Sequence, residues 1–326
     1  MNRLALLIII LFVFSIIGSA FAQDSSEYLL QEKPIGQIEP QPTQYNIAIQ
    51  LMNVRNVDRL NGTYDMTFWV IITSDKIDFT ASPPPEFEFV DGIDLETSGM
   101  HVEPHLVKYK VIGTFQHGFD YHIYPFETLD LTINIEPLYP GTADKIVLIP
   151  STPQSGQDTE ANNDIPGWDL SPGLTENKIH KYPWGEFSRY TAHYEVSSPP
   201  GMTFLKKLLT IIVLNIIVFA AFWFNPKSLT DRAAVAVGAI LASTYFHAQF
   251  LLAELPSVGY LTLADKIVFA SYALYTYCII SVLIHNRLGA HHGDEYQEKH
   301  ADRIDRKMRI IAPIVLVGTF LVLYPI

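Results

Sequence analysis

The chain has 326 residues and a formal net charge of −12, with 48% hydrophobic and 17% charged side chains. This charged share is well below the roughly 25% of an ordinary soluble domain, which argues against a fully soluble enzyme. A single cysteine, Cys278, excludes an intrachain disulfide framework and a CxxC metal site.

The negative charge is concentrated in one part of the chain. Residues 23–200 contain 26 acidic and 10 basic side chains, whereas residues 201–326 contain 8 and 11. An acidic surface attracts cations and repels phosphate groups. We therefore expect no nucleic-acid partner.

The N-terminus has the pattern of a secretory signal peptide. Arg3 precedes an apolar run over residues 4–17, and small residues follow it. This pattern predicts a signal peptide over 1–22 that is cleaved before Gln23, with an uncleaved anchor helix as the alternative. Residues 23–44 are polar and contain prolines, which is typical of a flexible leader.

Residues 45–200 have the pattern of an all-β domain. Apolar and polar residues alternate over 64–72 and 129–136, as in half-buried strands. Turn signals such as Asn61-Gly62 and Pro140-Gly141 recur between the apolar runs. Many short strands with frequent turns predict an immunoglobulin-like β-sandwich.

Residues 201–326 contain four apolar stretches, each close to the roughly 20 residues that span a bilayer. They lie at 204–224, 233–253, 261–284 and 310–326. The second stretch contains small and polar residues where contact with lipid would favour large apolar ones. We therefore expect it in the interior of a four-helix transmembrane bundle.

Basic residues indicate the orientation. The segment 285–309 contains six lysines and arginines, and the connection before the second stretch contains Lys227 and Arg232. Positive charge marks the cytoplasmic side, so 285–309 is the expected cytoplasmic loop and the N-terminal domain is expected outside the cell. This pattern predicts a multi-pass protein of the cell membrane.

Several motifs resemble those of a known family and occur in its order. Tyr124-Pro-Phe-Glu127 resembles the core of a signature loop, Gly167-Trp168-Asp169 resembles a strand motif, and Leu255-Pro256 follows the second apolar stretch. With this topology the chain is similar to the pentameric ligand-gated ion channels, in particular to prokaryotic members without the disulfide. The resemblance covers residues 45–326. It implies a homopentamer in a lipid bilayer, opened by a stimulus at the extracellular ligand-binding domain.

Three features depart from the family pattern. No Trp-x-Asp follows the second strand, Thr210 stands where relatives often have proline, and Ser197-Ser198 stand where many relatives have arginine. The ion pair that this arginine forms in the family therefore cannot be carried over to Glu127. We expect other contacts to couple the two regions.

The second apolar stretch is the expected pore lining, in one of two registers that differ by one residue. Anchoring from the cytoplasmic end gives Asp231, Ala234, Gly238, Leu241, Tyr245, and Ala248 or Gln249. Anchoring from Pro256 gives Val235, Ala239, Ala242, Phe246 and Gln249. We prefer the first register, because it places Leu241 as an apolar constriction at mid-pore.

Acidic residues at both ends of this stretch predict selectivity for inorganic cations. Asp231 is expected to form a ring at the inner mouth and Glu254 a ring near the outer mouth, next to an acidic outer domain. Alternatively, Asp231 caps its helix and pairs with Arg232.

The resemblance implies that the signature loop, 119–127, and the first hairpin turn, 58–62, press on the loop after the pore-lining helix, 256–262. The residues implied in this coupling are Asp58, Phe119, Asp120, Tyr124, Pro125, Phe126, Glu127, Pro256 and Tyr260.

The sequence leaves the stimulus open. Agonists of this family bind between subunits on aromatic clusters, and the matching regions contain Phe89, Tyr139, Tyr182, Trp184 and Phe187. An aromatic cage suits a small organic cation, although each ring also serves as ordinary sandwich core.

Protons and divalent cations are the competing stimuli. The outer domain contains His101, His105, His117, His122, His180 and His193, and histidine titrates near neutral pH. His247 lies within the second apolar stretch, where its alternative role is a hydrogen bond between helices. His101, Glu103 and His105 have the ligand types of a regulatory divalent site, although Pro104 excludes a helical metalloprotease motif.

No catalytic motif such as GxSxG or a P-loop occurs in a usable context, so we expect neither an enzyme nor a cofactor. The main alternative to a channel is a membrane sensor or scaffold whose β-sandwich binds a ligand while its helices do not conduct. An extracytoplasmic enzyme anchored by the helices would lack a catalytic constellation.

Overall fold

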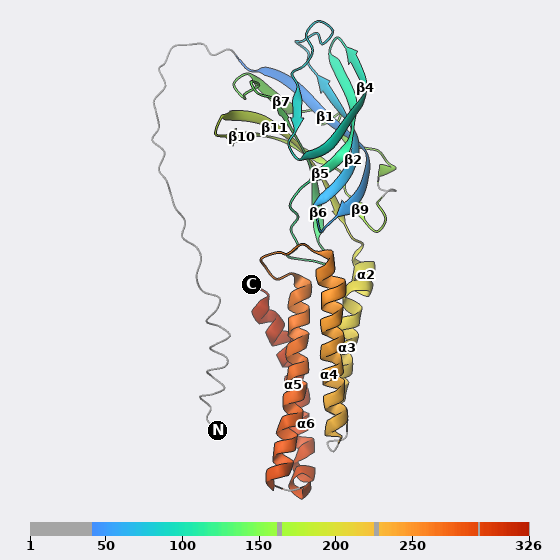
Figure 1. Cartoon of the computed structure of the whole chain (residues 1–326), viewed down its shortest axis with the longest axis vertical. Coiled ribbons are helices and arrows are strands. Elements are labelled where there is room, and N and C mark those ends of the chain that lie inside the picture. Colours follow the sequence, from blue (N-terminus) through green and yellow to red (C-terminus); the bar gives the residue numbers. More distant parts are fainter. Residues whose placement is uncertain (1–40, 162–164, 225–227, 293, 326) are drawn as a thin grey trace, which may run out of the picture. The chain divides into compact units, whose positions relative to one another are not determined.

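The computed structural model describes residues 41–161, 165–224, 228–292 and 294–325. The expected signal peptide, and the expected leader as far as residue 40, lie outside the described residues. Strands come first in the chain, and long helices follow from Pro200 onward (Figure 1).

Two sheets form a sandwich, as the alternating pattern predicted. The first sheet contains β1 (Thr43–Asp58), β2 (Thr63–Thr73), β4 (Gly92–Glu103), β5 (Leu106–Gln116), β7 (Ile146–Pro150) and β8 (Gly156–Gln157). The second contains β3 (Phe87–Phe89), β6 (Thr128–Pro137), β9 (Asp169–Leu170), β10 (Leu174–Tyr182) and β11 (Gly185–Ser197). Their orders are β4-β5-β2-β1-β7, with β8 beside β1, and β10-β11-β6-β3, with β9 beside β11.

The core of the sandwich lies between the two sheets. In β2 the buried side chains include Tyr64, Met66, Phe68, Val70 and Ile72, which is the two-residue period of a strand with one buried face. Tyr64 also links the sheets, because its hydroxyl donates to the Thr132 carbonyl at 2.7 Å and accepts from the Thr132 amide at 2.9 Å. Burial raises the pKa of the Tyr64 hydroxyl.

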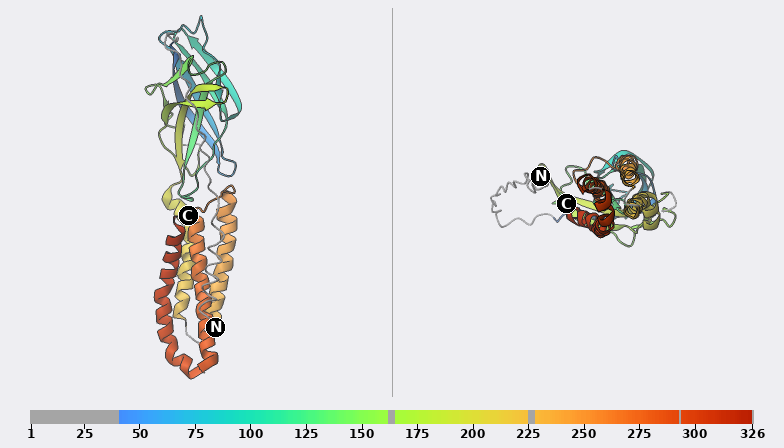
Figure 2. Two further views of the ribbon diagram at one scale, coloured as in Figure 1. Left: turned by 90° about the vertical axis from the view of Figure 1, so that its left-hand side faces the viewer. Right: turned by 90° about the horizontal axis from the view of Figure 1, so that it is seen from below.

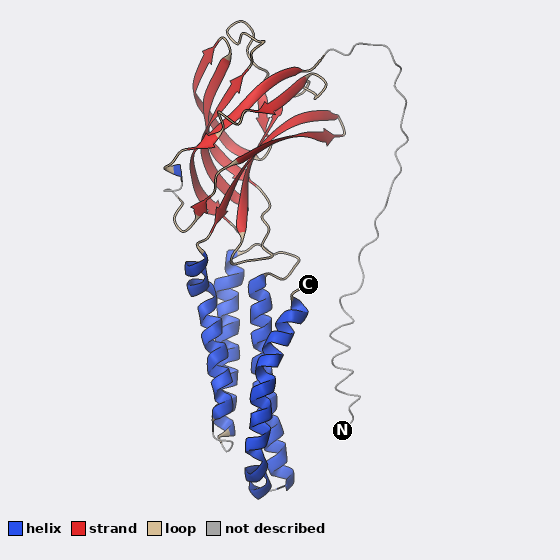
Figure 3. Cartoon of the chain, turned by 180° about the vertical axis from the view of Figure 1, so that it is seen from behind, coloured by secondary structure: helices blue, strands red, loops and turns tan. Residues whose placement is uncertain are grey.

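Four long helical stretches follow the sandwich. The first comprises α2 (Pro200–Thr203), a π-helical turn η2 (Phe204–Leu208), α3 (Leu209–Ala220) and a 3-10 turn η3 (Ala221–Trp223). The second comprises α4 (Leu229–Phe246), a π-helical turn η4 (His247–Leu251) and a 3-10 turn η5 (Leu252–Glu254). The others are α5 (Leu263–His292) and α6 (Asp294–Leu323). Helices α3 to α6 run side by side (Figure 2), and the sheets adjoin one end of them (Figure 3).

Three stretches of the described chain are long and apolar enough to cross a membrane. They are Pro200–Trp223, Leu229–Glu254 and Leu263–Arg287, which correspond to the first three expected spans. The fourth expected span, 310–326, contains the end of α6 and is not among them. A membrane location therefore has support from three helices, whereas a four-helix transmembrane bundle stays a prediction.

The segment 285–309 differs from the expected loop. It is helical on both sides of residue 293, because α5 continues to His292 and α6 begins at Asp294. His285, Asp305 and Met308 are buried. The polar residues that suggested a loop therefore include side chains that pack inside a helical hairpin.

Candidate functional site

The loop between β5 and β6 caps the start of α5. The amide of Leu263 donates to the His122 carbonyl at 2.9 Å, and the amide of Ala264 donates to the Tyr124 carbonyl at 3.0 Å. The first amides of a helix have no partner within it, so these bonds satisfy groups that would otherwise need water. The part of this loop that resembles the family's signature loop, residues 119–127, is called the signature loop below, and main-chain hydrogen bonds join it to the helical region.

Thr262 and Asp265 complete this helix start. The Asp265 carboxylate accepts hydrogen bonds from the Thr262 amide and hydroxyl, while the Asp265 amide donates to the Thr262 hydroxyl. This reciprocal pattern is a capping box. The other carboxylate oxygen of Asp265 lies 2.8 Å from His247 Nε2 in η4, which ties the end of the second helical stretch to the start of α5. A bond between helices is the alternative role expected for His247.

Tyr260 is the second contact between the signature loop and the loop before α5. Its hydroxyl accepts a hydrogen bond from the Tyr121 amide at 2.9 Å, and its ring stacks on His122 with centroids 3.8 Å apart and an interplanar angle of 2°. Asp120 orients His122, because its carboxylate accepts from the His122 amide at 2.9 Å and lies 2.5 Å from His122 Nδ1. These bonds lower the pKa of Asp120.

Arg59, in the turn after β1, lies at the junction, which is the region where the β-sandwich meets the helices. Its Nε donates to Glu127 at 2.6 Å, and its Nη2 lies 3.4 Å from the Ser198 hydroxyl. The guanidinium also lies 4.4 Å from the Trp168 ring centroid. Glu127, expected to lack its family partner, therefore pairs with an arginine from a different loop. Sequence reasoning missed Arg59, and the only signal was a basic residue in this turn together with the serines at 197 and 198.

Asp58 shapes the turn that presents Arg59. One oxygen of its carboxylate accepts from the amides of Leu60 and Asn61 at 2.8 and 3.2 Å, and the other accepts from the Asn61 side chain at 2.7 Å. The bond from the Asn61 side chain is the largest cause that lowers the pKa of Asp58. Asp58 is thus a turn-forming residue and does not contact the helices in these bonds.

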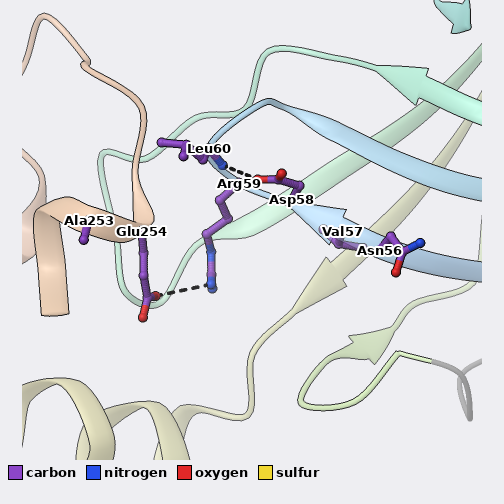
Figure 4. A pocket seen from close by; sticks show the side chains of 7 residues that line it. All are labelled: Asn56, Val57, Asp58, Arg59, Leu60, Ala253 and Glu254. Carbon is purple, nitrogen blue, oxygen red and sulfur yellow. Dashed lines mark hydrogen bonds and ion pairs between the residues drawn. The ribbon is translucent and has the colours of Figure 1, made fainter. Parts of the chain in front are cut away.

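Glu254 faces Arg59 across a groove of about 540 Å³ between the β1–β2 turn and the end of the second helical stretch (Figure 4). Its carboxylate lies 3.7 Å from Arg59 Nη1, accepts from the Tyr124 hydroxyl at 3.2 Å, and pairs with Lys207. Burial and the Glu254 charge raise the pKa of Tyr124. The structure thus places Glu254 in the junction, and its role as an outer pore ring stays a prediction.

The other coupling residues of the β5–β6 loop, which are Phe119, Pro125 and Phe126, have different surroundings. The Phe119 ring packs against those of Tyr64 and Tyr121 at centroid distances of 6.1 and 6.4 Å. Pro125 is buried, and Phe126 is partly buried and donates its amide to the Ile123 carbonyl. The structure also brings Tyr260, but not Pro256, into a described bond with this loop.

One face of α4 is exposed along its whole length in the single chain. It carries Asp231, Ala234, Gly238, Leu241 and Tyr245, and it continues to Ala248 and Gln249 in η4. Leu241 and Tyr245 are 66% and 65% exposed. In the alternative register, Ala242 is exposed, but Ala239 and Phe246 are buried and Val235 is half-buried. The exposed face therefore has the register anchored from the cytoplasmic end.

The π-helical turn η4 explains why the two anchors disagreed. A π-turn holds one more residue than an α-turn, so a helix that contains one shifts its register by one position. The two candidate registers differ by one residue before His247 and can share Gln249 after it. Counting from the cytoplasmic end and counting from Pro256 are thus both compatible with one helix.

Three of the five candidate aromatic residues gather on the β10–β11 hairpin. Tyr182 stacks on Trp184 with centroids 4.8 Å apart, and Phe187 meets Tyr182 edge-on at 5.7 Å. Trp184 is 65% exposed, whereas Phe187 is buried below the pair. Arg189 supports the cluster, donating to the Tyr182 hydroxyl at 3.0 Å and to Glu136 at 2.6 Å.

The other two candidates lie elsewhere. Phe89 packs in the sandwich core against Phe68 and Phe115, at centroid distances of 5.9 and 6.5 Å. Tyr139 is exposed on the connection after β6. Phe89 therefore has the packing role that was its alternative, and it does not join the hairpin cluster.

The three residues considered as ligands of a divalent ion, His101, Glu103 and His105, do not come together. His101 lies 2.8 Å from Glu103, but His105 Nδ1 faces the carbonyls of Ser74 and Ile77 at 3.0 and 2.9 Å. No cluster of three metal-ligating side chains occurs within the described part of the chain. His101 and Glu103 share one face of β4, whereas His105 lies in the turn beyond the strand and is directed to other partners, so the three do not form a common site.

No protein-family model matches this chain, and no curated protein matches it. Function is therefore inferred from the contacts themselves and from the motifs that resemble a family.

Proposed function

We propose that this protein is a homopentameric, cation-selective ion channel of the pentameric ligand-gated kind, gated by a stimulus at its outer domain. The observation that carries the proposal is the exposed face of α4. On a helix of membrane-spanning length and composition, this face bears Asp231, Ala234, Gly238 and Gln249 together with Leu241 and Tyr245.

This face is poorly suited to lipid and well suited to water. Small and polar side chains at membrane depth face a partner helix or an aqueous space, because each unsatisfied polar group is costly in hydrocarbon. In a ring of five copies, as the resemblance implies, the α4 helices would enclose a lumen. Leu241 and Tyr245 would narrow that lumen and form the apolar gate.

The charge distribution supports selectivity for cations. Asp231 is exposed at the start of α4 and would form an acidic ring at the cytoplasmic mouth. The outer domain adds the strong excess of acidic residues over 23–200, which would concentrate cations at the outer mouth.

The junction supports gating from the outer domain. The signature loop holds the first two amides of α5 and the Tyr260 hydroxyl, and Asp265 in the same turn of α5 holds His247 in η4. A displacement of the loop would therefore act on the second helical stretch through two steps of direct contact.

The hairpin cluster of Tyr182, Trp184 and Phe187 supports a small organic cation as the stimulus. Exposed aromatic faces attract a cation through the ring quadrupole. Protons and divalent ions would instead act elsewhere on the outer domain, so Trp184→Ala separates the stimuli: it would abolish the response to an organic cation and spare a response to acid.

The test is current across a planar bilayer that contains the purified full-length protein in a salt gradient. Outer pH, divalent concentration and small amines are stepped in turn. Stimulated current that reverses near the cation potential supports the proposal. Current with anion preference overturns the selectivity, and silence under every stimulus, with amine binding detected by thermal shift, favours the non-conducting sensor.

A further inference from the structure

A buried ionic cluster lies where α4, α5 and α6 meet, at the end of the helices away from the sheets. Arg232 is fully buried, and it is the largest such side chain among the described residues. Its Nη1 and Nη2 donate to the two oxygens of Asp305 at 2.9 and 3.0 Å, and Nη2 also donates to the Phe224 carbonyl at 3.1 Å. The pairing of Asp231 with Arg232 that we considered from the sequence is therefore wrong.

His285 completes the cluster from α5. Its Nδ1 lies 2.9 Å from the Ser281 carbonyl, and its Nε2 lies 3.2 Å from Asp305 Oδ1. The Ser281 carbonyl is an acceptor, so Nδ1 carries a proton, whereas Nε2 lies within ion-pair distance of Asp305 without a hydrogen bond to it. The Asp305 carboxylate favours the imidazolium form of His285, in which Asp305 is flanked by two cations.

The same cluster holds the end of the first helical stretch. Arg232 binds the Phe224 carbonyl, and Arg309 from α6 donates to the Phe222 carbonyl at 3.0 Å and lies over the Trp223 ring at 5.0 Å. Carbonyls at a helix end lack partners within the helix. The cluster thus connects all four helical stretches at the end of the helices away from the sheets.

Arg232 also defines the rotation of α4. Successive residues of a helix are about 100° apart, so a buried Arg232 directs Asp231 away from the cluster. The buried face of α4 runs through Arg232, Ala236, Ala239, Ser243 and Phe246. The exposed face runs parallel to it through Asp231, Ala234, Gly238, Leu241 and Tyr245. Ala and Ser side chains alone specify such a rotation weakly, whereas a buried, bidentate ion pair accepts one orientation.

We propose that Asp305 and His285 are positioning residues for the inner mouth of the pore, acting through Arg232 to direct Asp231 and the face of α4 behind it. The inference rests on the proposed channel function and deepens it. It assigns ion selectivity in part to two residues that lie on α5 and α6, outside the pore-lining helix.

The cluster also makes the inner mouth sensitive to the pH of the adjoining compartment, which is the cytoplasm in the orientation expected above. Without its second proton, His285 would present a lone pair to Asp305 or to the Ser281 carbonyl. Among the described interactions of His285, the charged partners are Asp305 of α6 and Arg232 of α4, and the first helical stretch approaches the cluster through the Phe224 carbonyl after η3. Raising cytoplasmic pH should therefore act like the removal of the imidazolium charge.

Two variants test the proposal, with a matched control. Asp305→Asn removes the charge that holds Arg232, and His285→Gln keeps hydrogen-bonding atoms but removes the imidazolium. Arg306→Gln is the control, because Arg306 is the exposed neighbour of Asp305 on α6. Size-exclusion chromatography and thermal unfolding establish that each variant is assembled. If Asp305→Asn does not assemble, His285→Gln decides the test.

The first readout is the preference for cations over anions, measured as the reversal potential in a salt gradient. We expect Asp305→Asn and His285→Gln to lower the cation preference about threefold to tenfold, while Asp305→Glu retains it and Arg306→Gln leaves it unchanged. Raising cytoplasmic pH should lower the preference of the wild-type protein but not that of His285→Gln. An unchanged preference in both assembled variants would overturn the proposal.

The second readout does not depend on conduction, so it separates this inference from the proposed function. Ala234→Cys lies on the exposed face and Ala236→Cys on the buried face, and the native Cys278 is buried. A charged, water-soluble thiol reagent should label position 234 at least about tenfold faster than position 236, and Asp305→Asn should reduce this ratio. If the wild-type protein carries no current, the channel proposal fails, and the labelling ratio still decides whether the cluster sets the rotation of α4.

Discussion

Arg59 Nε donates a 2.6 Å hydrogen bond to Glu127, and this bond ties the turn after β1 to the loop before β6. Glu127 is buried, whereas the side chain of Arg59 is 19% exposed. The same guanidinium faces Glu254 at the end of the second helical stretch. One cation thus neutralises a buried acid of the β-sandwich and approaches an acid of the helical region.

Arg59→Gln should uncouple the outer domain from the helices. The substitution leaves the Glu127 carboxylate buried without its cation, at a cost of about 2 kcal/mol for a hydrogen bond to a charged group. We expect a lower melting temperature and a stimulus midpoint shifted by about tenfold, since about 1.4 kcal/mol corresponds to tenfold. Thermal unfolding and dose–response currents measure the two effects.

Arg55→Gln is the matched control, because Arg55 is an exposed arginine on β1, four residues before Arg59, and its described hydrogen bond goes to the half-buried Asn53. It should leave both quantities unchanged. Arg59→Lys should fall between wild type and Arg59→Gln, because an ammonium retains the charge but loses the planar contact with Trp168. Equal behaviour of Arg59→Gln and Arg55→Gln would show that Arg59 has no part in coupling.

Tyr260→Phe should weaken coupling by a smaller amount. The change removes the hydroxyl that accepts from the Tyr121 amide and keeps the ring that stacks on His122. We expect a loss of about 1 kcal/mol and a shift of about fivefold in the stimulus midpoint. Tyr260→Ala, which also removes the stacked ring, should shift it further.

The control for Tyr260→Phe is Tyr324→Phe. Tyr324 is exposed near the C-terminus and accepts from Lys266 through its main-chain carbonyl, which the substitution keeps. Dose–response currents for the two variants should differ. If Tyr260→Phe and Tyr324→Phe give the same midpoint as wild type, the hydroxyl of Tyr260 has no role in gating.

Acid should loosen the junction through its carboxylates. Hydrogen bonds hold the pKa values of Asp58 and Asp120 below their ordinary value in the folded protein. A depressed pKa stabilises the fold above the unfolded pKa of about 4, and this stabilisation is lost as the pH falls through the lower folded pKa. The side chain of Asp120 is 75% exposed, so we expect its share to be at most about 0.5 kcal/mol.

Thermal unfolding in buffers from about pH 6 down to about pH 3 measures this dependence. Asp120→Asn should reduce the fall of the melting temperature at the acidic end of this range. Asp75→Asn, at an exposed position after β2, should leave the dependence of the melting temperature on pH unchanged. A profile for Asp120→Asn that falls as steeply as wild type would contradict the assignment.

The sequence predicted those features that depend on local patterns. Alternation over 64–72 and 129–136 became strands β2 and β6, and the loop 119–127 meets the loop before α5 as the motifs implied. Arg59 with Glu127, and Arg232 with Asp305, are 68 and 73 positions apart and carry no local signal. They arise only when tertiary packing brings buried charges together.

The same reasoning explains one ambiguity and one error of detail. The pore register was ambiguous because a π-helical turn changes the number of residues per turn, and composition does not reveal where such a turn lies. The segment 285–309 looked like a loop because its charged residues were counted without their direction, although His285 and Asp305 point into the helices. In both cases the missing information was which face of a helix is buried.

Leu241→Ala should favour the conducting state. Leu241 is 66% exposed in the single chain and lies midway along the face proposed to line the pore, where a ring of leucines excludes water from a narrow lumen. Alanine removes three carbons from each Leu241 side chain of the proposed pentamer, so the dry segment would become wider and easier to wet. We expect resting current without stimulus and a lower stimulus midpoint, measured in planar bilayers, with the fold unaffected because the side chain packs little within its own subunit.

Ile280→Ala provides the control for this volume change, since Ile280 is 45% exposed on α5 and lies outside the proposed lumen. It should leave the resting current at the wild-type level. Tyr245→Ala, one turn further along the α4 face, should resemble Leu241→Ala if both rings narrow the same lumen. If neither Leu241→Ala nor Tyr245→Ala changes the resting current or midpoint of a conducting wild-type protein, the pore does not follow this face of α4, and the rotation inferred from the buried Arg232 would have to be abandoned with it.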